Sequence, residues 1–224
     1  MRDQDLNDIQ RLPLFSGMAT EHFSQMLRAA YAQDFPAQLQ LFRQDDRADF
    51  LHVLMEGTVA LFAQSGGREA TMAIIRPVSS FILAACMLDQ PLLMSARTMS
   101  RSRIVLIPAT DVRKAFRADP EFAVAANRQL AMGFRDMVGQ AKSLKLRKSN
   151  ERLVDYLLTE LEVQGTAGRV LISAEKRVLA SFLGMTPESL SRAFKSLEAA
   201  GVRVSGSQVA IPDPQRLRAL LDDA

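Results

Sequence analysis

The chain has 224 residues and a formal net charge of +3, so it is long enough for two moderate domains, while its bulk charge is weak evidence for a nucleic-acid partner. Its one cysteine, Cys86, excludes an internal disulfide framework and a multi-cysteine zinc site, and fits a reducing compartment. The charged start MRDQDLNDIQR has no apolar signal region, and no apolar run reaches the roughly eighteen residues of a membrane helix, so we expect a cytoplasmic protein with no membrane partner.

The spacing of apolar residues along the sequence changes at about residue 31. Residues 1 to 30 show the spacing of apolar side chains that is typical of helices. From 31 to 108, short apolar or alternating runs are separated by turn residues, with Gly57 closing one strand and Gly66-Gly67 turning a hairpin. This pattern predicts a β-rich roll, and we place the end of the first domain at residue 120.

A long helix followed by a basic hinge is predicted from 121 to 148. Apolar residues recur there at alternating spacings of three and four, which is a heptad seam along which two copies of the chain can pair. The alternative is a helix that packs only on its own first domain. The residues expected at the dimer seam are Leu130, Phe134, Met137, Ala141 and Leu144, with Asn127 setting the register.

The last part of the chain, 149 to 224, reads as a domain that mixes helices with a hairpin. ERLVDYLLTELEVQ predicts a helix and GRVLIS a strand, and we expect Ser173 to cap the next helix. VRVSGSQVAIP predicts a hairpin that turns at Gly206-Ser207.

Between these elements, KRVLASFLGMTPESLSRAFKSL predicts two short helices joined by a tight turn. Ala180 suits the point where the helices approach, and Gly184 permits the turn. Thr186 is expected to cap the second helix, with Pro187 at its first position and Gly201 beyond its end. Together with the hairpin as a wing, this is the arrangement of a winged helix-turn-helix.

The second helix of this pair presents polar side chains suited to base edges. Glu188, Ser191 and Arg192 stand at i, i+3 and i+4 and therefore share one face. Arginine can contact guanine, and glutamate can accept a hydrogen bond from cytosine. The residues predicted to contact DNA are Glu188, Ser191, Arg192, Lys195, Lys176, Thr186 and Arg203, with the lysines placed for phosphates. The alternative is a winged helix that contacts protein.

The motif LGMTPESLSRAF resembles the recognition motif of the Crp/Fnr superfamily of bacterial transcription regulators, in its Fnr-type form with glutamate, two residues and then serine-arginine. The resemblance extends from about Leu12 to Ile211. It implies an α+β chain with an N-terminal β jelly-roll sensor domain of the cyclic-nucleotide-binding type, a dimerisation helix and a C-terminal winged helix-turn-helix domain. It also implies a homodimer that binds palindromic double-stranded DNA with TTGAT-like half-sites, and RNA polymerase as a partner.

The sensor domain departs from two known members of the superfamily. In the cyclic-nucleotide-binding members a glutamate binds the ribose and an arginine the phosphate, but Ala84 and Met94 stand at those positions, so we expect no cyclic AMP. Arg97 is the alternative partner for a phosphate. Oxygen-sensing members hold an iron–sulfur cluster with four cysteines, which a chain with one cysteine cannot do.

An apolar stretch remains as the candidate effector pocket, with Phe81, Leu83, Ala84, Met87 and Met94 as its lining. Such a lining suits haem or another flat apolar ligand. The alternative is that these residues fill the roll.

ADFLHVLMEG, FILAA, LLMSART and LGMTPESLSRAF together look most like the NnrR/Dnr branch of the superfamily. That resemblance implies an activator of denitrification genes that responds to nitric oxide through haem, for which His52 and Cys86 are the candidate ligands. A ligand-independent regulator and a sensor of another small apolar effector stay open as alternatives. An enzyme is not expected, because no acid/base or nucleophile constellation is present.

Overall fold

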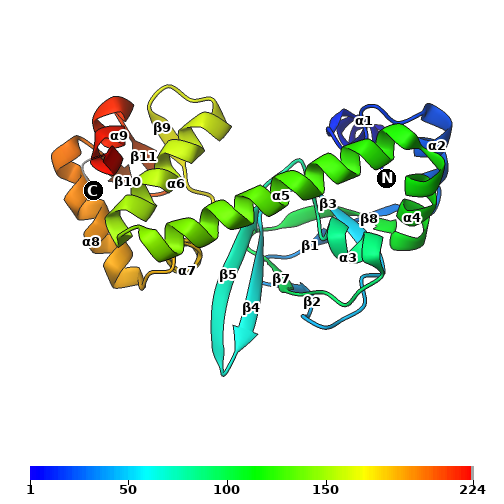
Figure 1. Cartoon of the computed structure of the whole chain (residues 1–224), viewed down its shortest axis with the longest axis horizontal. Helices are drawn as coiled ribbons and strands as arrows, with labels where there is room; N and C mark the ends of the chain where they lie inside the picture. The colour runs from blue at the N-terminus through cyan, green and yellow to red at the C-terminus, as the bar shows by residue number, and fades with distance from the viewer. Residues whose placement is uncertain (223–224) are drawn as a thin grey trace. The chain divides into compact units, whose positions relative to one another are not determined.

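The computed structural model describes residues 1–222 and divides the chain into two compact units, Met1–Asp136 and 137–224 (Figure 1). The helix α5 (Pro120–Leu146) crosses the boundary between the units. Within the described residues, no helix combines the length and the hydropathy needed to cross a membrane.

The first unit is built on two antiparallel four-stranded sheets, ordered β1-β8-β3-β6 and β2-β7-β4-β5. The strands are β1 (Tyr31–Phe35), β2 (Gln40–Phe42), β3 (Phe50–Glu56), β4 (Val59–Ser65), β5 (Arg68–Ile75), β6 (Ser79–Phe81), β7 (Ser95–Thr98) and β8 (Ser102–Pro108). The helices are α1 (Asp3–Arg11), α2 (Thr20–Met26), α3 (Leu83–Leu88) and α4 (Ala109–Ala118), followed by α5. The predicted β roll is therefore confirmed.

Two apolar clusters hold this unit together because the strands bury side chains on both faces. Leu54 and Ile104 from one sheet meet Leu61 and Ala96 from the other, and this cluster fills the interior of the roll. A second cluster joins the outer face of β3 and β8 to the helices, with Phe122 of α5 among its fully buried members. The first turns of α5 are thus part of the first unit.

Glycine is required where β3 turns into β4. Gly57 has a φ of +94°, and a Cβ there would lie 2.3 Å from the Oγ of Ser102 and 2.5 Å from the main-chain oxygen of Arg101. The tip of the next hairpin, between β4 and β5, turns at Gly66 and Gly67 with positive φ at both, as predicted.

A buried ion pair ties the N-terminal helix to the roll. Arg103 of β8 donates to both carboxylate oxygens of Asp5 in α1, at 3.2 and 2.7 Å, and both side chains are buried. The hydrogen bond from Arg103 holds the pKa of Asp5 below its ordinary value. Asp119, also buried, accepts from the main-chain nitrogens of Ala19 and Phe122 and so connects α2 to the start of α5.

The second unit is a winged helix. Its elements are the end of α5, α6 (Ser149–Gln164), β9 (Arg169–Leu171), α7 (Lys176–Phe182), α8 (Pro187–Leu197), a 3₁₀ turn (Glu198–Ala200), β10 (Arg203–Ser205), β11 (Gln208–Ala210) and α9 (Pro214–Asp222). The three strands form one sheet in the order β10-β11-β9. The hairpin between β10 and β11 turns at Gly206 and Ser207, as predicted.

The expected cap of α7 is wrong. The helix begins at Lys176 with Glu175 at the N-cap position, two residues after Ser173. The chain bends at Ala174, which is buried, and takes an extended conformation at Glu175, so the helix starts later than the serine alone would place it.

Candidate DNA-reading surface and effector cavity

The start of α8 follows from its local sequence. The Oγ1 of Thr186 accepts a hydrogen bond from the main-chain nitrogen of Ser189 at 3.2 Å, and Pro187 occupies the first position of the helix. Gly184 has a φ of +62° in the turn before it. The cap and the turn predicted from the sequence are both confirmed.

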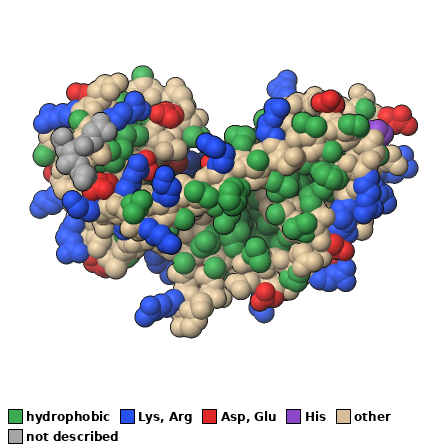
Figure 2. Space-filling model, viewed as in Figure 1, with side chains coloured by type: hydrophobic (Ala, Val, Ile, Leu, Met, Phe, Trp, Pro, Cys, Tyr) green, Lys and Arg blue, Asp and Glu red, His purple; other side chains and the backbone are tan. Residues whose placement is uncertain are grey.

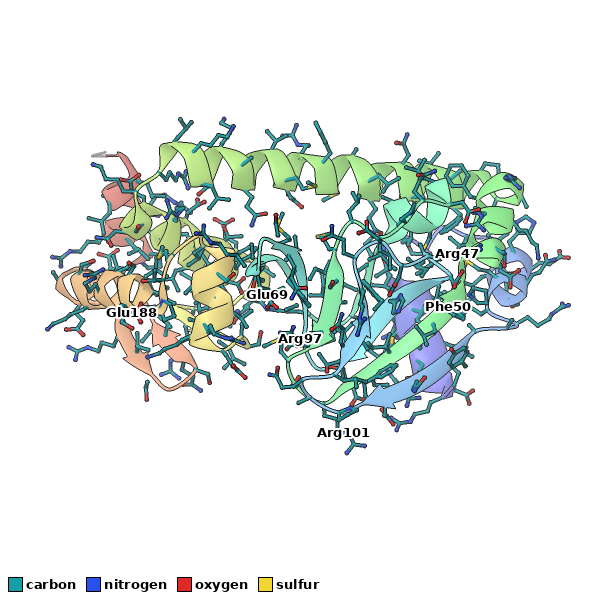
Figure 3. The ribbon with its side chains drawn as sticks, turned by 90° about the horizontal axis from the view of Figure 1, so that it is seen from below. Arg47, Phe50, Glu69, Arg97, Arg101 and Glu188 are labelled. Atoms are coloured by element: carbon teal, nitrogen blue, oxygen red, sulfur yellow. The ribbon has the colours of Figure 1, made fainter. Side chains whose placement is uncertain are left out.

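The two faces of α8 differ sharply. Leu190, Ala193, Phe194 and Leu197 are buried in the apolar cluster of the second unit. The opposite face exposes the residues predicted to contact DNA, which are Glu188, Ser191, Arg192 and Lys195. Figure 3 labels Glu188 on this helix. These four side chains follow one another at i, i+3, i+4 and i+7, so one strip of the helix can enter a groove.

Hydrogen bonds within this strip set what each side chain offers. Ser191 donates from Oγ to the main-chain oxygen of Pro187 at 2.9 Å, which leaves its oxygen as an acceptor. Arg192 donates from Nη2 to the Oγ of Ser189 at 3.2 Å. The pKa of Glu188 is lowered by its own main-chain N–H and then by the Thr186 hydroxyl, so it is a carboxylate that only accepts.

The other predicted contacts surround this strip within the same unit. Lys176 is exposed at the start of α7, Thr186 is exposed at the cap of α8, and Arg203 is exposed on β10 of the wing. Exposed cations at a helix start and on a wing are suited to phosphates.

Arg152 is a residue that the sequence analysis missed. It lies on α6 and donates to the main-chain oxygens of Arg147, Leu183 and Gly184, at 2.7, 2.8 and 3.1 Å. It therefore joins the end of α5 to the turn between α7 and α8. Its only signal in the sequence is an arginine at the start of an amphipathic helix, which is common on solvated faces.

The exposed face of α5 carries most of the predicted seam. Phe134 and Met137 are 69% and 66% exposed, although both are large and apolar. Ala141 and Leu144 are also exposed, as are Met132 and Val138 beside them. Figure 2 shows apolar side chains gathered along the middle of this helix. Leu130 differs, because it is half-buried against the cluster of the first unit.

The structure divides the predicted effector pocket between two clusters. Phe81 and Met94 belong to the interior of the roll, whereas Leu83 and Met87 lie on α3 and pack with the helices. Ala84 is exposed on α3. The five residues are therefore not brought together as one lining, because the apolar run from 83 to 88 forms a helix whose faces point different ways.

Arg97 is not free to bind a phosphate. Its guanidinium donates to both carboxylate oxygens of Glu69, at 3.3 and 3.1 Å, and lies 4.5 Å from the centre of the Phe62 ring (Figure 3). A charge already paired and stacked would have to give up both contacts to take a ligand.

His52 and Cys86, the candidate haem ligands, share one partner. The Nδ1 of His52 and the Sγ of Cys86 lie 3.1 and 3.3 Å from the main-chain oxygen of Phe50. Burial raises the pKa of the Cys86 thiol to about 12 and lowers that of His52 to about 4. Cys86 is fully buried and is not among the residues that line the cavity at His52, so the two side chains do not face one haem-sized space.

His52 offers a neutral ring nitrogen to a cavity of about 370 Å³. Asp46 and Asp49 also line that cavity, and their negative charges oppose the carboxylates of a haem. The two residues therefore do not form a fitting haem site together, and His52 alone keeps a free nitrogen.

Comparisons with known proteins agree with both units. The family model described as a cyclic nucleotide-binding domain matches residues 32–119, and the model of a Crp-like helix-turn-helix domain matches residues 151–220. A CRP-like cAMP-activated global transcriptional regulator of Mycobacterium tuberculosis is 22% identical, over 93% of this chain and 96% of its own. The nitrogen fixation regulation protein FixK of Azorhizobium caulinodans is 26% identical, over 83% of this chain and 77% of its own.

Solved structures share the architecture. FixK2 of Bradyrhizobium japonicum has a TM-score of 0.79 at 22% identity, with 86% of this chain and 97% of that chain covered. DNR of Pseudomonas aeruginosa has a TM-score of 0.54 at 21% identity, with 98% of each chain covered. A sensor roll, a long helix and a winged helix with an exposed reading strip thus occur in one chain, and both family models match it. The chain is a DNA-binding transcription regulator of the Crp/Fnr family.

Proposed function

We propose that this regulator binds as a homodimer to a palindrome with TTGAT-like half-sites. The observation that carries the proposal is the exposed strip of α8, where Glu188, Ser191 and Arg192 stand side by side in the order glutamate, two residues, serine-arginine. A carboxylate acceptor, a hydroxyl and a guanidinium can read three or four neighbouring base pairs of a major groove.

The apolar face of α5 supports the dimer. Phe134 and Met137 cost free energy when exposed to water, and a second copy of the same helix can cover them along the heptad seam. A dimer also meets the geometry of a palindrome, whose half-sites lie about 34 Å apart.

The proposal for the target genes rests on the resemblance of the sequence to the NnrR/Dnr branch. We propose that the protein activates genes of nitrogen-oxide metabolism together with RNA polymerase, and that nitric oxide is the signal. A regulator that senses another small apolar effector is the second candidate, and the cavity at His52 favours it.

A binding assay with the full chain tests the proposed sequence-specific DNA binding. A fluorescent duplex with the TTGAT palindrome is compared with a single half-site and with a scrambled duplex, at several salt concentrations. We expect tight binding to the palindrome alone and an affinity that falls steeply with salt. Equal affinity for the scrambled duplex would contradict the proposal.

An absorption spectrum tests the nitric oxide response separately. Protein purified from haem-supplied cells is measured before and after nitric oxide is added. A stoichiometric Soret band that shifts with the gas supports haem as the sensor. Absence of the band would exclude haem as the sensor and would leave the proposal for DNA binding unchanged.

A further inference from the structure

The cavity that His52 faces is formed within the first unit, beside the loop between β2 and β3. Its volume is about 370 Å³, within the range of small-molecule sites. Main-chain hydrogen bonds from Asp45 to Leu92 and from Leu92 to Asp46, at 2.8 and 2.9 Å, fix this loop to the segment after α3. The apolar part of the wall is made by Leu41, Phe42, Phe50, Ile82 and Leu92.

The tautomer of His52 follows from its partner. A carbonyl oxygen only accepts, so the contact between Nδ1 and the main-chain oxygen of Phe50 at 3.1 Å requires the proton on Nδ1. Burial keeps the ring neutral at pH 7, because the pKa is lowered to about 4. Nε2 is therefore unprotonated, and its lone pair can accept a hydrogen bond.

Among the described residues His52 has a hydrogen-bond partner only at Nδ1, and since no fully buried polar side-chain atom lacks a partner, Nε2 is reached by solvent. His52 is 9% exposed and lines the cavity. The rings of Phe42 and Phe81, each with its centre 5.1 Å from that of the imidazole, hold its orientation. A fixed acceptor in an apolar wall discriminates strongly between ligands that carry a donor and ligands that do not.

The charges at the cavity limit what can enter. Asp46, Arg47 and Asp49 line it, and the Nε of Arg47 lies 3.6 Å from the Oδ1 of Asp49 (Figure 3 labels Arg47 and Phe50). One arginine against two aspartates leaves a negative balance, which disfavours an anion. Among the residues the structure describes, no group of three ligating side chains could hold a bare metal ion.

We propose that this cavity binds a small, flat, uncharged aromatic molecule that donates one N–H or O–H to Nε2 of His52. Indole and phenol are the simplest members of this class. The ring lies against Phe42 and Phe50, and the donor satisfies the nitrogen that the protein leaves open. The proposal concerns the roll alone and does not depend on which DNA sequence the protein reads.

Calorimetric titration of the full chain with three probes tests the donor. Indole supplies an N–H, benzofuran has the same shape with an oxygen in its place, and indole-3-carboxylate adds a negative charge. We expect indole to bind about tenfold more tightly than benzofuran, and the carboxylate to bind more weakly than indole. Equal affinities for indole and benzofuran, or no binding of indole at millimolar concentration, would overturn the proposal.

Variants locate the site. His52→Phe keeps an aromatic ring between Phe42 and Phe81 and removes the acceptor, so indole should lose its tenfold advantage while benzofuran binds as before. His22→Phe changes the other histidine, which does not line this cavity, and should leave both affinities unchanged. An advantage of indole that persists in His52→Phe would place the ligand elsewhere.

A spectroscopic test needs no variant and therefore survives a folding defect. In the wild-type protein labelled with ¹⁵N at histidine, indole should shift the Nε2 resonance of His52 and leave that of His22 in place. Benzofuran should cause a much smaller change. An Nε2 resonance of His52 that does not move at saturating indole would contradict the proposal.

Discussion

The guanidinium of Arg152 donates from Nε to the main-chain oxygen of Leu183 at 2.8 Å. Leu183 is the C-cap residue just after α7, so an arginine of α6 fixes the turn that leads into α8. A second bond, from Nη1 to the oxygen of Arg147, ties the same side chain to the chain just after α5. Gly184 lets this turn approach α5 closely, because a Cβ there would lie 2.7 Å from the side chain of Leu144.

Arg152→Ala should destabilise the second unit by about 1 to 3 kcal/mol, because three carbonyls lose a charged donor. Urea unfolding followed by Tyr156 fluorescence in a Tyr31→Phe background measures this, since the chain has two tyrosines. Arg218→Ala is the control, because its exposed pair with Glu162 is expected to contribute less than about 1 kcal/mol. Equal losses in the two variants would contradict the role of Arg152.

Arg192→Ala should weaken the free energy of operator binding by about 1 to 3 kcal/mol per half-site. It should also reduce the preference for guanine at the base pair that Arg192 contacts. Lys195→Ala is the matched control on the same strip, since a phosphate contact carries no base preference. It should weaken binding to all sequences alike and reduce the salt slope by about one unit. Binding-site selection at one salt concentration, together with a salt titration, separates the two. If Arg192→Ala lowered the affinity for all DNA sequences equally, Arg192 would contact a phosphate and not a base.

Phe134→Glu combined with Met137→Glu should abolish dimerisation and operator binding, although neither residue lies on the reading strip. Leu130 is left unchanged, because its contact with the cluster of the first unit would mix a folding defect into the result. Val163→Glu is the control, as Val163 is equally apolar and 70% exposed on α6. Sedimentation and operator titration report the outcome, and a double variant that stays dimeric would refute the seam.

Asp5→Asn should destabilise the first unit at neutral pH by about 3 kcal/mol, because Arg103 stays buried with only the half-exposed Asp34 beside it. The pKa of Asp5 is lowered in the folded state, so its contribution is present above the ordinary value of about 3.8 and is lost as pH falls through the folded value. The difference in the free energy of unfolding between wild type and Asp5→Asn should therefore become smaller below about pH 4.

The measurement is urea unfolding at several pH values, followed by Tyr31 fluorescence in a Tyr156→Phe background. Glu56→Gln serves as the control, because Glu56 forms an exposed pair with Arg2 at 3.8 Å and should give little change at any pH. A gap for Asp5→Asn that is independent of pH would show that the ion pair does not contribute.

The elements that the sequence predicts well are those specified by residues close together in the chain. Gly184 and the Thr186-Pro187 pair specify a turn and a helix start within four residues, and the structure confirms both. The hairpin at Gly206-Ser207 is likewise specified by its own turn chemistry. The strip of α8 follows because helical spacing alone places Glu188 and Arg192 on one face.

The features that the sequence does not predict depend on residues far apart in the chain. The bond between Arg152 and Leu183 spans 31 positions, and the cavity at His52 needs the loop near Asp46 to meet Leu92. The apolar run from 83 to 88 has no charge to show which face is outward, so its division between two clusters follows only from packing. Ser173 shows the same limit at a helix start.

The shared carbonyl of Phe50 has a consequence for labelling experiments. Cys86 is fully buried, donates to that oxygen and keeps its proton, so thiol reagents should react with it very slowly at pH 7 while the protein is folded. Because it is the chain's one cysteine, a cysteine introduced at an exposed position would carry a maleimide dye or nitroxide almost alone. Spin labels could then be placed on the wing and on the roll of an otherwise native sequence, and the distance between them measured with and without operator DNA.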